Sequence, residues 1–274
     1  MVAAAGHVHQ RSGYTIVAEA ILITAAGKRI GKCLAEMLAK QGYYIYLHYH
    51  TSQSETEETL KSIQAQGGNG ALIPGDLGDY DQVEGLLNLC SHPDHPLRHV
   101  INNASQFIND SLLDFTEDSF ASHQNVNLRA PLQLARALHG RIPDGEKGSV
   151  INIIDSKAFA LNPDFHSYTL SKYALRGATE TMAQALSPKV RVNGIAPGLT
   201  LISSTQSARN FDLASHLNFI GEPLDVADIA KTALLLLTSK SINGTTIPVD
   251  GGQKMINFTG DVVNVAKNIL KKPE

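Results

Sequence analysis

Residues 20–42 read AILITAAGKRIGKCLAEMLAKQG and join an apolar run, a short turn and an amphipathic segment. The run at residues 20–24 is apolar at nearly every position, which indicates a strand buried on both faces. Apolar residues then recur at helical spacing over residues 29–42, and Gly42 ends the pattern. The segment therefore predicts a buried strand that enters a helix through a tight turn.

The same alternation of short apolar runs and longer helical patterns continues along the chain. Because continuously apolar strands joined by helical crossovers are typical of parallel sheets, we expect an α/β fold. It is a single Rossmann-type doubly wound parallel sheet with helices on both faces. Further strands are predicted over residues 43–50, 71–77, 99–104, 149–155, 190–198 and 245–252, and helices over 55–68, 80–90, 125–140, 165–186 and 225–239.

Three regions are expected along the chain. Residues 1–17 are small and polar and read as a flexible arm, without the basic start and apolar core of a secretion signal. Residues 18–255 form the one domain, and residues 256–274 form a C-terminal helical extension. That extension is expected to dock on the body or on a neighbouring subunit through an apolar face of Val262, Val263, Ala266, Ile269 and Leu270.

Composition excludes several classes of partner. Of the 274 residues, 43% are hydrophobic and 18% charged, and the net charge of -3 gives no footprint for nucleic acid or an anionic membrane. The longest apolar runs fall well short of the ~20 residues that a bilayer span needs. Two cysteines, Cys33 and Cys90, are too few for a disulfide scaffold and favour a reducing, cytoplasmic setting.

The turn at residues 24–31, TAAGKRIG, has the spacing of a dinucleotide site. Such a site needs small residues, so that the backbone approaches the pyrophosphate at a helix N-terminus. Against the pattern T-G-x-x-x-G-x-G, Ala25 and Arg29 replace the first two glycines, Gly31 is in register and Gly27 is not. A plain strand-to-helix turn is the alternative.

Polar residues near this turn point to a phosphate. Arg29 offers planar, bidentate donors for the phosphates or for a substrate; a solvated arginine at a helix start is the alternative. The strand end HYHTS carries no Asp or Glu that would bind a ribose 2′-hydroxyl. Instead, His50, Thr51 and Ser52 are able to donate hydrogen bonds to a 2′-phosphate, which favours NADPH as the cofactor. The alternative is a polar strand end that has no part in nucleotide binding.

Tyr168 and Lys172 are four residues apart on a predicted helix and share one face. A nearby cation lowers the pKa of a phenol and makes it a proton donor near neutral pH, whereas a surface pair is the plain alternative. Asn127 lies inside a predicted helix, where asparagine is a poor helix former. It predicts a kink that frees a carbonyl to hold a water near Lys172, unless it is a tolerated polar residue.

These elements, in this order, resemble the short-chain dehydrogenase/reductase family over roughly residues 18–255. The motifs are TAAGKRIG, DL at 76–77, NNAS at 102–105, Asn127, Tyr168, Lys172, NGIAPG at 193–198 and VDGG at 249–252. The resemblance implies that residues 18–255 bind NADPH. The implied cofactor-binding residues are Thr24, Lys28, Arg29, Ile30, His50, Thr51, Ser52, Asp76, Leu77, Asn103, Ala104, Ser105, Tyr168, Lys172, Pro197, Gly198 and Thr200.

Asp155 occupies the position where the family usually has a serine. Together with Arg29, LHYH at 47–50, Phe107 after NNAS, and Thr200 after APGL, it makes the chain similar to the pteridine reductases. Dihydromonapterin reductases of the folate branch share the Asp–Tyr–Lys set. One departure is Thr51, where the pteridine reductases usually carry an arginine that holds the phosphate.

This resemblance implies a reaction and a homotetramer. NADPH gives a hydride to a ring C=N of a dihydropterin, and dihydrofolate is a possible further substrate. Tyr168 supplies the proton, Lys172 holds the nicotinamide ribose, and Asp155 orients Tyr168 and meets ring N–H groups. Phe107 stacks on the pterin, and Ser105 and Arg29 bind its polar edge. The catalytic residues are thus Asp155, Tyr168, Lys172 and Asn127, and the substrate-binding residues are Arg29, Ser105, Phe107, Asp155 and Tyr168.

Plainer alternatives stay open for several of these residues. The alternative for Asp155 is a strand-end cap, for Phe107 an ordinary core residue, and for Thr200 merely the start of the loop 200–219, which is expected to form a lid over the pocket. The rival activities are reduction of a 3-oxoacyl thioester or a quinone, and a non-catalytic, nucleotide-sensing role. The first predicts little change when Asp155 becomes serine.

A histidine-rich segment, SHPDHPLRH at 91–99, has side chains of the types that bind metals. Its prolines and its place in a connection favour a solvated loop instead. No metal is expected.

Overall fold

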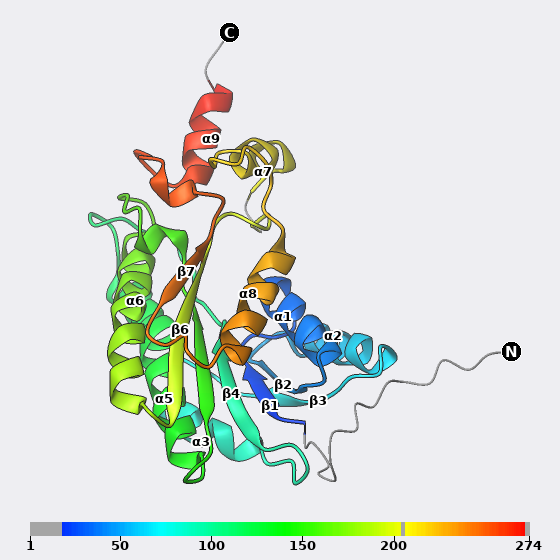
Figure 1. The fold of residues 1–274 in the computed structure, drawn as a ribbon. Coiled ribbons are helices and arrows are strands. Elements are labelled where there is room, and N and C mark those ends of the chain that lie inside the picture. The colour runs from blue at the N-terminus through cyan, green and yellow to red at the C-terminus, as the bar shows by residue number, and fades with distance from the viewer. Residues whose placement is uncertain (1–17, 204–205, 272–274) are drawn as a thin grey trace, which may run out of the picture.

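Seven parallel strands form one sheet in the computed structural model, which describes residues 18–203 and 206–271 (Figure 1). The strand order is β3-β2-β1-β4-β5-β6-β7, so the chain runs outward from β1 in both directions, as in a doubly wound fold. The expected fold class is confirmed. The strands are β1 (Ala20–Ile23), β2 (Tyr44–Tyr49), β3 (Asn69–Pro74), β4 (Leu97–Asn102), β5 (Gly148–Ile153), β6 (Val190–Pro197) and β7 (Thr246–Val249).

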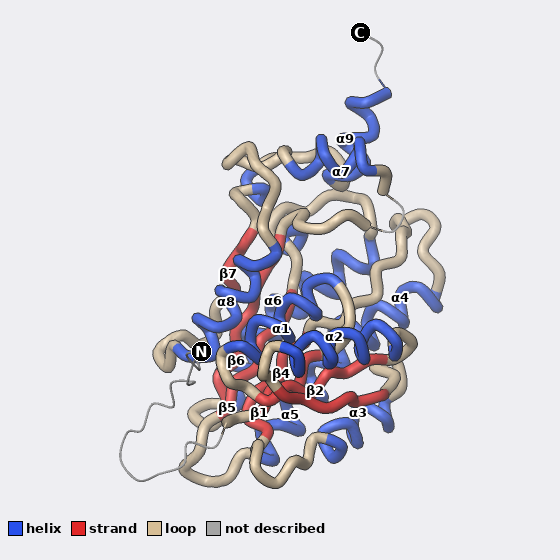
Figure 2. The backbone as a smooth tube through the Cα atoms, turned by 90° about the vertical axis from the view of Figure 1, so that its right-hand side faces the viewer, coloured by secondary structure: helices blue, strands red, loops and turns tan. Residues whose placement is uncertain are grey.

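Helices cover both faces of this sheet (Figures 1 and 2). One face carries α1 (Arg29–Lys40), α2 (Gln53–Ala65) and α8 (Val226–Thr238). The other carries α3 (Tyr80–Leu86), α5 (Ala130–Arg141) and α6 (His166–Leu186), while single 3-10 turns follow α3 (Leu87–Leu89), β5 (Ser156–Ala158) and β7 (Gln253–Met255).

Two apolar cores follow from the alternation of side chains along the strands. Leu22, Val100 and Val150 lie in a cluster with Leu134 of α5, whereas their neighbours along the strands lie in a second cluster with Leu34 of α1. All five of these side chains are fully buried. This double burial is why the strands read as continuous apolar runs in the sequence.

The structure differs from the sequence predictions in two segments. The helix expected over residues 125–140 is preceded by α4 (Glu117–Gln124), and a π-helical turn (Asn125–Arg129) joins it to α5. Thr116 starts α4 through a reciprocal capping box with Ser119. In the segment expected to be a lid loop, residues 208–215 form the helix α7 (Ala208–Ser215), and residues 204–205 lie outside the described residues.

The expected C-terminal helix is α9 (Val262–Lys271), and it stands beside α7 beyond the carboxyl ends of the strands (Figure 1). Ala266 is fully buried, so the apolar face docks on the body of the same chain, although Ile269 remains 44% exposed. Among the described residues, no helix is both long and apolar enough to cross a membrane.

Candidate active site

The glycine turn keeps a left-handed backbone at the two positions where alanine and arginine replace glycines of the expected pattern. Ala25 and Arg29 both adopt left-handed φ angles, of 51° and 52°. Glycine adopts this conformation without steric cost, so both positions coincide with those of the expected glycines. A Cβ on Gly31 would lie 2.1 Å from the Ala25 carbonyl oxygen, and one on Gly27 would lie 2.3 Å from Thr56 Oγ1. The off-register glycine is therefore explained by the close approach of α2.

A buried histidine holds this turn in place. The Ala25 amide donates to His48 Nδ1 over 3.1 Å, so the Nε2 of the same ring donates to the Gly75 carbonyl over 3.2 Å. Burial lowers the pKa of His48 to about 4 and keeps the ring neutral. His48 belongs to the LHYH strand end, but nothing in that motif indicates this role.

The end of β4 is fastened to the same turn. The Asn103 amide donates to Thr24 Oγ1 over 2.8 Å, and the Asn103 side chain donates to the carbonyls of Thr24 and Ala25. The Ala104 amide also donates to Thr24 Oγ1, over 2.9 Å. Hydrogen bonds thus join the expected nucleotide-binding residues that follow β1 and β4. The half-buried Ile30 lies beside them in the first turn of α1.

The predicted phosphate-binding end contains two carboxylates that the strand-end pattern did not reveal. Lys28 Nζ lies 2.5 Å from Glu55 Oε1, and His50 Nδ1 lies 3.8 Å from Asp76 Oδ1. Thr51 is exposed and Ser52 half-buried at the same place, where Leu77 is buried. These acids come from α2 and from the segment after β3. The absence of acids from HYHTS therefore does not mean that the surroundings of this strand end lack carboxylates.

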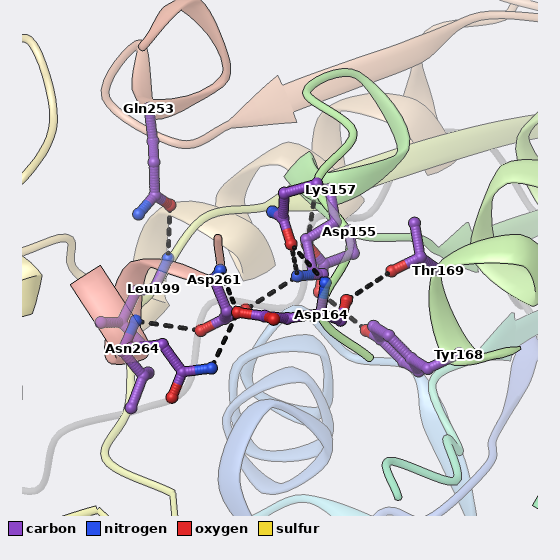
Figure 3. A network of polar contacts seen from close by, with 11 residues as sticks. Asp155, Lys157, Asp164, Tyr168, Thr169, Leu199, Gln253, Asp261 and Asn264 are labelled. Carbon is purple, nitrogen blue, oxygen red and sulfur yellow. Dashed lines mark hydrogen bonds and ion pairs between the residues drawn. The ribbon is translucent and has the colours of Figure 1, made fainter. Parts of the chain in front are cut away.

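Asp155 and Tyr168 form the expected pair (Figure 3). The Tyr168 hydroxyl donates to Asp155 Oδ2 over 2.7 Å, while Asp155 Oδ1 accepts from the Lys157 amide over 2.7 Å. The carboxyl group therefore caps the turn after β5 and also holds the phenol. Burial raises the pKa of Asp155, although its hydrogen bonds with Lys157 and Tyr168 act in the opposite direction.

The pKa of Tyr168 is raised well above its ordinary value, because the phenol is buried and faces the Asp155 carboxylate. The prediction that Lys172 lowers it is wrong for this arrangement. Lys172 Nζ donates instead to the Ile153 carbonyl over 2.8 Å, and burial lowers the lysine pKa to about 8. The two side chains do share one helix face at the carboxyl end of β5, as expected.

Asn127 lies in the π-helical turn, which confirms the predicted irregularity in this helix. Its side chain accepts from the Gln106 amide over 2.8 Å and donates to the Gln106 carbonyl and to Ser171 Oγ, over 3.0 Å each. Asn127 thereby connects the loop after β4 with the residue that precedes Lys172. The water held by a freed carbonyl stays a prediction.

Phe107 is 48% exposed, so it is not a core residue. Its ring stacks on Phe165, with 4.3 Å between ring centroids and 12° between planes, and meets Tyr168 edge-on at 4.6 Å. Phe165 begins α6 with a left-handed φ of 54°, an uncommon conformation for a bulky residue. Nothing in the sequence marks Phe165, since a phenylalanine at a helix start gives no signal of a left-handed backbone.

A buried polar cluster supports the start of α6. Asp110 accepts from the Ser167 amide over 3.0 Å and from the Ser167 hydroxyl, and so caps the helix from a distant loop. His123 Nε2 accepts from the Ile108 amide, so its Nδ1 donates to Ser167 Oγ over 2.7 Å. This cluster fixes the residue before Tyr168. No local sequence signal identifies a cap that lies 57 residues away.

The loop after β6 closes the other side of the site. Arg29 donates to the Leu201 carbonyl over 3.1 Å and to the Ile202 carbonyl, so it bridges the turn and this loop. The Leu199 amide donates to Gln253 Oε1 over 3.1 Å (Figure 3). The remaining predicted residues lie at the same end of the sheet: Pro197 is buried, Gly198 and Thr200 are half-buried, and Ser105 is exposed.

The histidine-rich segment was expected to be a solvated loop. Two of its imidazoles instead pack on an aromatic ring. His95 stacks on Tyr44 with 4.6 Å between ring centroids, and His92 lies 4.9 Å from the same ring. His99 Nε2 lies 2.9 Å from Glu19 Oε2. Within residues 18–203 and 206–271, no group of three or more His, Cys, Asp or Glu side chains is arranged to hold a metal ion.

Comparison with known families and proteins agrees with this geometry. The family model described as short chain dehydrogenase matches residues 19–213. A 3-oxoacyl-[acyl-carrier-protein] reductase from Synechocystis sp. is 26% identical over 246 residues, which are 88% of this chain and 98% of that protein. The corresponding reductase FabG from Staphylococcus epidermidis is 26% identical over 243 residues, covering 85% and 98%.

Two solved structures give higher identities. FolM alternative dihydrofolate reductase 1 from Brucella suis, in complex with NADP, is 36% identical with a TM-score of 0.84, covering 88% of this chain and 97% of that one. The Brucella canis protein, also with NADP, is 35% identical with a TM-score of 0.82, covering 88% and 96%.

Proposed function

The chain belongs to the short-chain dehydrogenase family, and from this premise we propose that it reduces a dihydropterin to a tetrahydropterin with NADPH. Dihydrofolate is a further proposed substrate. The observation that carries the proposal is the hydrogen bond from Tyr168 to Asp155, 2.7 Å long, in the position where the family usually has a serine. The resemblance to two FolM dihydrofolate reductases at 35% and 36% identity supports the same substrate class.

The residues of the glycine turn fit a dinucleotide. A side chain at Gly31 would collide with the turn itself, and α1 carries no acidic residue in its first turn. Among the described residues, Lys28 at the start of α1 makes no capping hydrogen bond, so the first amides of the helix are open to an anion. Lys28 and His50 are the proposed ligands of the 2′-phosphate, since both side chains lie at this end of the site, beside Glu55 and Asp76.

When bound, NADPH supplies the hydride that reduces the ring carbon of the C=N bond. Tyr168 supplies the proton to the adjacent nitrogen, because burial and Asp155 keep its phenol protonated at neutral pH. Asp155 orients that phenol, and its own raised pKa allows it to share the proton that the phenolate must regain. Hydride and proton together convert C=N to CH–NH. Lys172 and Asn127 hold the helix and loop that frame this pair.

A carboxylate suits a pterin better than a ketone. A pterin edge presents N–H groups, which donate hydrogen bonds, and a carboxylate accepts from them. A ketone oxygen instead requires a donor, which a serine supplies and an ionised aspartate does not. Phe107, half exposed beside Tyr168, provides an aromatic wall for a flat ring.

The second candidate is reduction of a 3-oxoacyl thioester. It is favoured by the two 3-oxoacyl-[acyl-carrier-protein] reductases, each 26% identical over most of this chain. A ketone-reducing enzyme would tolerate serine at position 155, whereas a pterin reductase would lose turnover.

The test compares substrates under one set of conditions. NADPH consumption is followed with dihydrobiopterin, dihydrofolate and a panel of ketones and 3-oxoacyl thioesters. The parent is run beside Tyr168→Phe and the matched control Tyr173→Phe, which alters a 51% exposed tyrosine of the same helix. We expect the pterin to react fastest, Tyr168→Phe to lose nearly all turnover, and the control to behave like the parent. Equal rates in Tyr168→Phe and the parent would rule out this role.

A further inference from the structure

A buried ion pair joins the C-terminal segment to the turn that follows β5. Lys157 Nζ lies 2.9 Å from Asp261 Oδ2, and the side chains are only 9% and 10% exposed. The same ammonium donates to Asn162 Oδ1 over 3.0 Å. Burying two charges costs desolvation energy that their attraction often fails to recover, so such a pair is weak evidence for stability and calls for another explanation.

The C-terminal segment is fastened to both walls of the site. Asp164 Oδ2 accepts from the Asp261 amide and from Asn264 Nδ2, over 2.8 Å each (Figure 3). On the opposite wall, Asn210 of α7 donates to the Val263 carbonyl over 3.0 Å. The start of α9 therefore braces residues 156–165 against the helix that follows the loop after β6.

Lys157 is also the residue that holds Asp155. Its amide donates to Asp155 Oδ1, and its ammonium lies 5.4 Å from the centre of the Phe165 ring, which stacks on Phe107. A movement of Lys157 would thus reach the carboxylate through one hydrogen bond and the aromatic wall through one contact. The ion pair with Asp261 is the contact that holds the Lys157 ammonium in this position.

We propose that Lys157 and Asp261 are positioning residues, through which the C-terminal segment orients Asp155 toward Tyr168 and sets the electric field at that pair. The inference rests on the proposed function only in taking Asp155 as the catalytic carboxylate. It gives the C-terminal extension a part in the reaction, although none of its described residues is assigned to the substrate or the cofactor.

The charges around the pair determine the sign of the effects. Asp155 faces Lys157 from the turn and Tyr168 and Lys172 from α6, and Tyr168 also faces Asp261 and the edge of His123. Against the larger effect of burial, Lys157 lowers the pKa of Asp155. Neutralising Asp261 leaves that ammonium uncompensated and is expected to lower the Asp155 pKa further. Neutralising Lys157 is expected to raise it.

The experiment uses the full chain with Lys157→Gln, Asp261→Asn and the double variant. Asp144→Asn is the matched control, since it breaks the Lys189–Asp144 pair of 3.2 Å, whose Asp144 is fully exposed in the connection before β5. The pKa of the Asp155 carboxyl is measured by carbon NMR and assigned with Asp155→Asn. We expect a fall of about one unit in Asp261→Asn, a rise of about one unit in Lys157→Gln, and no change in the control.

The double variant keeps the test decisive if a single buried charge prevents folding. With both charges removed, the Asp155 pKa should return near the parent value, yet kcat should fall at least about fivefold because the brace is lost, which corresponds to roughly 1 kcal/mol. The KM for NADPH should not change. A parental kcat in the double variant, or shifts of the same sign in both single variants, would overturn the inference.

The proposed function fails separately from this inference. The carboxyl pKa is measured without substrate, and kcat is taken with whichever pterin or ketone the parent reduces. Absence of pterin turnover in the parent would reject the pterin assignment, whereas the opposite pKa shifts would still decide the role of Lys157 and Asp261.

Discussion

Tyr168 directs its phenolic hydrogen toward Asp155 Oδ2, with 2.7 Å between the oxygens, while Asp155 Oδ1 is held by the Lys157 amide. The carboxyl group is therefore fixed at both ends, and its orientation does not depend on a ligand. Because the tyrosine is 5% exposed and faces a carboxylate, ionising it is unfavourable. The phenol therefore carries its proton before the substrate binds, as the proton donor of a reductase must, although the raised pKa makes it a weaker acid than a free tyrosine.

Replacing Asp155 is expected to separate cofactor binding from chemistry. Asp155→Ser and Asp155→Asn should lower kcat for a dihydropterin by about 10²–10⁴, the usual contribution of a positioned acid or base. The dissociation constant for NADPH, measured by fluorescence titration, should stay within about twofold of the parent, because the proposed role of Asp155 is toward Tyr168 and the substrate and not toward the cofactor. Unchanged pterin turnover in Asp155→Ser, together with reduction of ketones, would favour the 3-oxoacyl alternative.

Lys172 is expected to make kcat/KM for NADPH depend on pH, and its pKa gives the direction of the change. Burial lowers the pKa of Lys172 from 10.5 to about 8, so the side chain is charged below that pH and neutral above it. If the cation holds the nicotinamide ribose, kcat/KM for NADPH is level below pH about 8 and falls about tenfold per unit above it. Lys172→Met should lower kcat/KM and remove this alkaline limb. The role fails if the limb persists in that variant.

The fold and the turn could be predicted because each follows from local sequence. The strands are marked by continuous apolar runs and the helices by their spacing, and a turn has a fixed length. Ala25 and Arg29 show the limit of such patterns. The backbone keeps its left-handed angles at both positions without glycine, so the spacing identifies this turn more reliably than the glycine count does.

The rest of the site depends on residues that the fold alone brings together. Asp110 caps α6 across 57 residues, and Asp261 reaches Lys157 across 104. Contacts between residues so far apart in the chain produce no recognisable pattern in the sequence. Glu55 shows the same limit, because it approaches the predicted phosphate site from α2. Asp76 is among the expected cofactor-binding residues, but its approach to His50 is not apparent from the sequence.

Phe107 is expected to act on the substrate alone. Phe107→Ala should raise the KM for a dihydropterin about threefold to tenfold, since a stacked aromatic pair is worth about 0.5–1.5 kcal/mol beyond its buried area. The KM for NADPH should not change. Phe107→Leu is the matched control, which keeps most of the apolar surface and should lie between the two. Equal KM values for the pterin in all three proteins would exclude stacking on this ring.

His48 is expected to stabilise the turn only while it is neutral. Its pKa is lowered from 6.5 to about 4, so its contribution to folding is present above pH about 6.5 and is lost as the pH falls toward about 4. From this shift, about 2 kcal/mol of stability should be lost between pH 7 and pH 5.

His48→Phe tests this contribution because it leaves the Ala25 amide and the Gly75 carbonyl without their partner. Each such buried group costs about 1–3 kcal/mol, so urea unfolding at pH 7 should show a clear loss of stability. The difference between variant and parent should shrink at pH 5, where the parent pays for keeping its histidine neutral. His139→Phe, at a half-buried position of α5, controls for the substitution itself. A difference that stays constant between the two pH values would mean that the turn is held by something other than a neutral ring.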